Sequence, residues 1–198
     1  IQFKNIISTL YLLPNENNAS IFNDIYNHIS QNNFMLEPYS KLAVILIELF
    51  DEFKTVFYDT TETYFTNYTK FKLPICKSYD EICDQNIKKD KIKHHGVFII
   101  NTLIILKETD KINTYLNMIQ TYIKNNILHI ENKDTLEFIS TIYKCIAILC
   151  IKEFYDICPI IKTHIEYIIN LKEDKNINRK ILFNHMDIND IINKCENN

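Results

Sequence analysis

Apolar residues recur at every third or fourth position along most of the chain, a spacing that is typical of amphipathic helices. The clearest face follows Asp134, a good N-terminal cap, and consists of Leu136, Ile139, Ile142, Tyr143, Ile146, Leu149 and Cys150. Further faces predict helices at about 3–13, 20–29, 38–53, 109–123, 159–169 and 177–194. The third of these helices either continues or bends near Asp51, giving a helix through Tyr68.

The segment 93–107, KHHGVFIINTLIILK, is apolar on nearly every side. A surface helix has one apolar stripe, whereas this segment has to be covered on both flanks. Its uncharged part would rise about 20 Å, which is too short to cross a bilayer, since that takes about 20 apolar residues. We therefore predict a central helix, with Gly96 in its first turn. Before it, 78–87 is expected to form a short separate helix, and the KKDK tract is expected to face solvent.

The composition favours a fold made of helices alone. The 198 residues include one glycine, four prolines and no tryptophan, and sheets of short strands use glycine freely in their turns. We predict an all-α fold with a single domain over 1–198, built as an α-solenoid of antiparallel helix pairs. Helix-pair repeats of the HEAT type, of roughly 40–47 residues, would fit four or five times. A closed helical bundle is the alternative.

The net charge and the cysteines indicate which partners and which cellular compartment to expect. With a net charge of −3, the domain as a whole has no electrostatic attraction to nucleic acid or anionic lipid. Three of the six cysteines, Cys145, Cys150 and Cys158, lie in or beside apolar helical patterns, as reduced core thiols do. We expect a reducing intracellular compartment and no membrane segment. Because the chain begins at Ile1 without a leader, we expect it to be part of a longer protein.

The densest positive cluster is the tract NIKKDKIKHH. It contains Lys88, Lys89, Lys91 and Lys93, which are candidates for binding RNA phosphates. A solvated lysine-rich surface is the other interpretation, because Asp84 and Asp90 dilute the cluster.

A second charged group opens the last predicted helix. Arg179 and Lys180 are followed by Asp187 and Asp190, at most about two turns away. These four residues are candidates for binding a protein partner, and Arg179, the only arginine, can grip a carboxylate with two hydrogen bonds. Structural ion pairs within the chain are the alternative.

The sequence offers little support for catalysis. Cys76, Cys83, His94 and His95 lack the short cysteine spacing of a zinc site, so we predict no metal. One glycine cannot build a phosphate-binding loop. One catalytic alternative remains: a cysteine nucleophile and a histidine base that are far apart in the sequence but adjacent in the fold. We predict no enzyme, no catalytic residue and no cofactor.

Three segments, in order, resemble the middle domain of the translation initiation factor 4G family, a HEAT-type α-solenoid. In the first, FKNIISTLYLL to EPYSKL, the positions that match the family are Asn33, Phe34, Tyr39 and Leu42. In the second, the helix of 93–107, they are Ile99, Ile100 and Leu103. In the third, NINRKILFNHMDINDI, they are Lys180, Phe183, Asp187, Ile188 and Asp190.

The resemblance implies a scaffold in translation initiation rather than an enzyme. Its partner would be a DEAD-box RNA helicase of the initiation-factor-4A type, with mRNA as a further ligand, in the cytoplasm. Related scaffolds serve cap-binding, splicing-linked and nonsense-mediated decay complexes, and a nuclear location would follow for some of these. A helical hydrolase is the remaining alternative.

Overall fold

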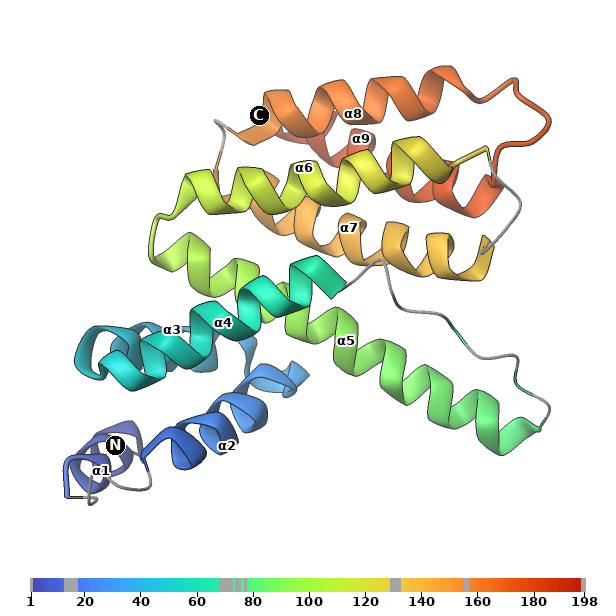
Figure 1. The fold of residues 1–198 in the computed structure, drawn as a ribbon. Coiled ribbons are helices and arrows are strands. Elements are labelled where there is room, and N and C mark those ends of the chain that lie inside the picture. The colour runs from blue at the N-terminus through green and yellow to red at the C-terminus, as the bar shows by residue number, and fades with distance from the viewer. Residues whose placement is uncertain are drawn as a thin grey trace.

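The computed structural model describes residues 2–12, 18–67, 73, 76, 78–128, 133–154 and 157–196, and within them it is all-helical (Figure 1). The helices are α1 (Gln2–Leu10), α2 (Asn18–Ser30), the short 3₁₀ helix η2 (Asn33–Met35), α3 (Leu36–Leu49), α4 (Asp51–Asn67), α5 (Tyr79–Ile105), α6 (Thr109–Asn126), α7 (Lys133–Glu153), α8 (Cys158–Asn170) and α9 (Arg179–Glu196). The predicted all-α class is confirmed. None of the described helices is long and apolar enough to cross a membrane.

The helices pack in two series. In one series α3 packs against α5, α5 against α7, and α7 against α9. In the other, α2 packs against α4 and α6 against α8. Helices adjacent in sequence also pack, as α2 does with α3, α6 with α7, and α8 with α9. In Figure 1, α5 runs between the helices of the N-terminal half and those of the C-terminal half.

The C-terminal half of α5 is the centre of the core. Phe98, Ile99, Ile100 and Leu103 are each at most 1% exposed, because α3 covers one side of the helix and α7 the other. This confirms the prediction that the segment is covered on both flanks. The hydroxyl of Thr102 is also buried there, and it donates a hydrogen bond to the Phe98 carbonyl oxygen.

The structure corrects the sequence prediction around α5. One helix of 27 residues begins after Ser78, whose hydroxyl accepts a hydrogen bond from the Glu81 amide at 3.2 Å. The start predicted for a short helix was right, but its end at Ile87 was wrong. The KKDK tract continues the helix because lysine is a good helix former. Gly96 therefore lies deep inside α5 and not in its first turn.

Tyr64 of α4 explains why a glycine is needed at position 96. The Tyr64 hydroxyl donates to the Ile92 carbonyl oxygen at 2.9 Å, and this holds the hydroxyl end of the ring against Gly96 of α5. A side chain at position 96 would occupy the space of that ring. The only glycine of the chain thus leaves room for the hydroxyl end of the Tyr64 side chain.

The other boundaries agree with the predictions to within a few residues. Phe50 is extended, with φ −135° and ψ 111°, and separates α3 from α4, so the bend near Asp51 is confirmed. Helix α7 begins at Lys133, which places Asp134 in its first turn and not at the cap. The first helix ends at Leu10; its predicted end at Leu13 lies outside the described residues.

Candidate interface groove

A polar cavity lies where α5, α7 and α9 meet. Its volume is about 630 Å³, and its lining includes Lys89 and Lys93 from α5 and Lys180 from α9. Some residues of the two charged clusters that were predicted from distant parts of the sequence therefore share one surface. The remaining lining residues are Asn86, Asp90, Asp134, Glu137, Phe138 and Thr141.

A second cavity of about 510 Å³ adjoins the first and shares Glu137 and Lys180 with it. It adds Lys133, Lys175 and Arg179, which come from the start of α7, the segment before α9 and the start of α9. We call the two cavities together the groove. Its charged residues are Lys89, Lys93, Lys133, Lys175, Arg179 and Lys180 against Asp90, Asp134 and Glu137. The groove is thus basic, although the whole chain is acidic.

Two ion pairs hold part of this charge in place. The Lys93 ammonium lies 2.7 Å from the Asp90 carboxylate, and its hydrogen bond lowers the pKa of that carboxyl group. The Lys180 ammonium lies 3.3 Å from Glu137, which also accepts a hydrogen bond from the side-chain amide of Asn178 at 2.9 Å. The contacts of Glu137 fix the start of α9 against α7 at the centre of the groove, whereas the Lys93–Asp90 pair lies within α5.

Three basic residues of the groove remain available to a ligand. Lys89, Lys133 and Lys175 form no ion pair with another described residue. Lys133 and Lys175 were not among the predicted sites, because each stands alone in a polar segment of the sequence. Only the packing of α6, α7 and α9 brings them beside Arg179.

The other predicted residues are placed as follows. Lys88 and Lys91 are exposed on α5 but do not line the groove. Arg179 donates from Nη1 to the Lys172 carbonyl oxygen at 3.0 Å, so it holds the preceding turn rather than a carboxylate. Asp187 pairs with Lys144 of α7, and Asp190 is exposed. The structure thus uses Lys180 and Asp187 for ion pairs within the chain.

A pair of buried histidines, which the sequence analysis missed, joins α8 to α9. The Nε2 atoms of His164 and His185 are 3.2 Å apart, and Nδ1 of His185 donates to the Ile181 carbonyl oxygen at 2.8 Å. Because Nδ1 of His185 carries the proton, its Nε2 accepts from Nε2 of His164. Burial lowers the pKa of His164 to about 3 and that of His185 to about 4.

Aromatic and polar side chains of the core surround the histidine pair. Tyr143 of α7 stacks on His185 and accepts a hydrogen bond from the Gln120 amide at 2.8 Å. His185 and Tyr143 are fully buried. His164 is 7% exposed, and the two imidazoles pack in the core between α7, α8 and α9. The spacing of His164 in the sequence could have predicted its burial, because it lies on the same helical face as Ile161, Ile165 and Ile168.

His95 has a similar role in the N-terminal half. Its Nε2 forms a hydrogen bond of 2.7 Å with the Tyr26 hydroxyl, and the Tyr64 ring lies edge-on to the imidazole with ring centroids 5.0 Å apart. Burial lowers the pKa of His95 to about 4, so it is neutral at physiological pH. The contact ties α2, α4 and α5 together. Among the residues with described positions, no three histidine, cysteine or acidic side chains gather as a metal site would require.

The residues that carry the family resemblance fall in different environments. Leu42, Ile99, Ile100, Leu103 and Ile188 are buried. Phe34 and Phe183, in contrast, are 96% and 59% exposed. No protein-family model, no curated protein and no solved structure matches the chain.

Proposed function

We propose that this chain is a helical scaffold of mRNA translation initiation, which binds a DEAD-box RNA helicase and RNA through the groove. One observation carries the proposal: basic residues from α5, α7 and α9 converge on one surface. The resemblance of three ordered segments to the middle domain of initiation factor 4G supplies the class of partner. The cytoplasm is the corresponding location.

The proposal includes a HEAT-type α-solenoid. Its packed helix pairs would be α2/α3, α6/α7 and α8/α9, while α4 and α5 would form a further pair joined mainly where Tyr64 contacts Ile92 and Gly96. The contacts of α3, α5, α7 and α9 in succession support it, because each repeat of a solenoid packs mainly on its neighbours. In such an arrangement the helices of one series line an extended surface. The groove lies across three helices of that series.

The mixed charge of the groove supports two ligands. Lys89, Lys133 and Lys175, without ion-pair partners among the described residues, can each neutralise an RNA phosphate. Asp134 and Glu137, together with Arg179 and Lys180, offer a protein partner carboxylates beside cations. Complementary charge of this kind fixes the register of two proteins and raises their association rate.

The first test is calorimetric titration of the protein with an initiation-type DEAD-box helicase, with the ATPase rate followed in parallel. We expect binding with a stimulated ATPase. The double variant Arg179→Glu/Lys180→Glu should weaken binding at least tenfold. Lys54→Glu, an exposed charge reversal on α4 outside the groove, serves as the control. A folded protein that binds no such helicase would rule out this part of the proposal.

The second test measures the affinity of the protein for RNA, by fluorescence anisotropy with a labelled single-stranded RNA 12-mer over a series of salt concentrations. Each phosphate contact contributes roughly 0.7 to the slope of log affinity against log salt. The double variant Lys89→Glu/Lys133→Glu should therefore reduce the slope by about 1.4. A slope equal to that of the wild type would place the RNA elsewhere. Binding to a helicase of a splicing or decay complex would favour the related scaffolds.

A further inference from the structure

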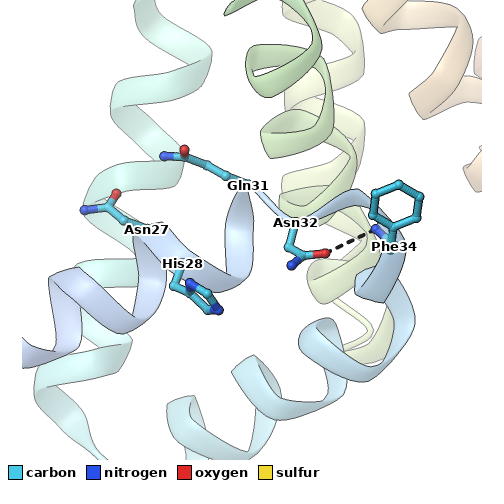
Figure 2. Close-up of a pocket in the computed structure, with 5 residues that line it drawn as sticks. All are labelled: Asn27, His28, Gln31, Asn32 and Phe34. Atoms are coloured by element: carbon cyan, nitrogen blue, oxygen red, sulfur yellow. Dashed lines mark hydrogen bonds between the residues drawn. The ribbon is translucent and has the colours of Figure 1, made fainter. Parts of the chain in front are cut away.

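The exposed apolar side chains of the protein differ in what surrounds them. The ring of Phe34 is 96% exposed and lies at one end of a pocket of about 330 Å³ at the end of α2. Figure 2 shows the side-chain amides of Asn27 and Gln31 pointing away from this ring, on the other side of the end of α2. A single exposed apolar residue with polar neighbours is ordinary on a protein surface. The first half of α5, in contrast, carries apolar and charged side chains in a regular order.

This first half of α5 projects from the rest of the fold. Its start extends past the neighbouring helices (Figure 1), and none of residues 79–91 is buried. As a helix, the stretch is about 20 Å long. A helix of this length is only marginally stable in water without packing partners. A second helix packed on it would therefore stabilise it.

Two adjacent rows of side chains run along one side of the stretch, each with a spacing of four residues. The first row consists of Tyr79, Cys83, Ile87 and Lys91. The second row consists of Asp80, Asp84 and Lys88. Residues three or four positions apart are neighbours on a helix surface, so the two rows form one face. The apolar part of this face meets solvent, since Tyr79 is 78% and Ile87 56% exposed.

The charges of this face are separated along the helix. Asp80 and Asp84 lie in its first two turns, and Lys88 and Lys91 lie in the next two. All four side chains are exposed, and none forms an ion pair with another described residue. The helix macrodipole favours acidic residues in the first turn, but it does not account for lysines in the middle of a helix.

We propose that this face of α5 pairs with the same face of a second copy of the chain, in antiparallel orientation about a two-fold axis. A two-fold interface uses one surface twice, so that surface has to be complementary to itself. An axis near position 86 places Asp84 opposite Lys88 of the second copy and Asp80 beside its Lys91. By symmetry the same two pairs form again on the other side of the axis.

The apolar row fits the same register. With the axis at this position, Ile87 of each copy lies beside Cys83 of the other, so the centre of the contact is apolar. A parallel pair would place aspartates against aspartates and lysines against lysines, which repel. The separation of charge along the helix therefore favours the antiparallel pair over the parallel one.

The contact is small and electrostatic. Pairing over about 20 Å of helix buries less surface than the roughly 1,600 Å² of a standard interface, so we expect a weak, transient dimer. Salt screens exposed charges and should weaken it further. Lys88 and Lys91 do not line the groove, so the pairing does not depend on the proposed binding of RNA or of a helicase.

Sedimentation equilibrium of the whole chain, over a range of protein and salt concentrations, tests the pairing. We expect a monomer–dimer equilibrium that shifts toward monomer as salt is added. The variant Lys88→Glu/Lys91→Glu should dimerise at least about tenfold more weakly, because four attractive pairs become repulsive. The control Lys54→Glu/Lys152→Glu changes the net charge by the same amount at exposed positions of α4 and α7, and should dimerise as the wild type does.

A second variant makes the test specific to this face. Asp80→Lys/Asp84→Lys leaves only basic charges in the two rows, whereas Lys88→Glu/Lys91→Glu leaves only acidic ones. Each variant alone should be monomeric, but an equal mixture should form a heterodimer, because all four pairs are attractive again. Circular dichroism would confirm that both variants fold.

Three results would overturn the proposal. They are a wild type that stays monomeric at low salt, a dimer that Lys88→Glu/Lys91→Glu does not weaken, and a mixture of the two folded variants that does not associate. None of them bears on the RNA and helicase titrations, which depend on the groove. Failure of those titrations would likewise leave the pairing of α5 intact.

Discussion

Gly96 and Tyr64 are so close that a Cβ atom on Gly96 would lie 2.4 Å from the Tyr64 hydroxyl oxygen and 2.9 Å from its ring carbon Cζ. The ring cannot easily yield, because it is 7% exposed and packed edge-on to Phe65 and His95. The joint between α4 and α5 therefore depends on the absence of a side chain at position 96.

We predict that Gly96→Ala destabilises the fold, although alanine is the better helix former. Overpacking of a core costs typically 1–3 kcal/mol, while the gain in helix propensity is about 1 kcal/mol. The difference, a net loss of about 1 kcal/mol and at most about 2 kcal/mol, should appear in urea unfolding. In a Tyr64→Leu background the same substitution should cost clearly less. An equal cost in both backgrounds would show that Tyr64 is not the cause.

At Lys107, in contrast to Gly96, a residue with a side chain occupies a position that favours glycine. Of the described non-glycine residues, only Lys107 has a positive φ, of 60°. It ends α5 in a turn in which Lys107 N donates to the Ile104 carbonyl and Glu108 N to the Leu103 carbonyl, each at 3.0 Å. This is the Schellman arrangement, in which glycine is the preferred residue at the position of Lys107.

Lys107→Gly should therefore stabilise the protein by about 0.5–1 kcal/mol, because the left-handed conformation costs lysine about 1 kcal/mol. Thermal unfolding followed by circular dichroism would measure this. Lys107→Ala is the matched control, since it removes the same side chain without relieving the backbone. If both variants have the same melting temperature, side-chain loss and not backbone strain explains the result.

Local patterns predicted most helices but not how they meet. The faces of 136–150 and 161–169 are core faces, as their spacing indicated. The continuity of α5 was missed because a lysine-rich tract looks like a loop, although lysine favours helix. The histidine pair and the groove join residues 21 or more positions apart, such as His164 with His185 and Lys89 with Lys180. Such contacts depend on tertiary packing, which periodicity does not encode.

The buried histidines should make the protein sensitive to mild acid. His164, His185 and His95 are neutral in the folded state, with pKa values lowered to about 3, 4 and 4. The unfolded chain binds protons below the ordinary histidine pKa of about 6.5, so stability falls as pH decreases from about 6.5 toward 4. Each buried histidine should cost about 2 kcal/mol at pH 5.

Urea unfolding at pH 7.5 and pH 5.0 would measure this loss. Tyr143 and Lys124 face the His164–His185 pair from α7 and α6. Burial raises the pKa of Tyr143, so this phenol stays neutral in this range. The double variant His164→Gln/His185→Gln should show a smaller difference between the two pH values. His28→Gln, at an exposed position, should leave the difference unchanged. Equal stability of the wild type at both pH values would contradict a neutral buried pair.

The last prediction concerns Glu137, the acidic residue shared by both parts of the groove. Its carboxylate pairs with Lys180, and its side chain is 18% exposed. Glu137→Gln keeps the shape and can still accept the hydrogen bond from Asn178, but it releases Lys180 from its ion pair. RNA affinity should therefore rise, and the salt slope should steepen by up to about 0.7, since one more cation can neutralise a phosphate.

Glu153→Gln, near the end of the same helix and outside the groove, is the control and should change neither quantity. Far-UV circular dichroism would confirm that both variants fold. If Glu137→Gln binds RNA with the affinity and slope of the wild type, Lys180 does not contact phosphate. The groove would then bind its protein partner through Arg179 and Lys180, while RNA would rely on Lys89, Lys133 and Lys175, so the two ligands would divide the groove between them.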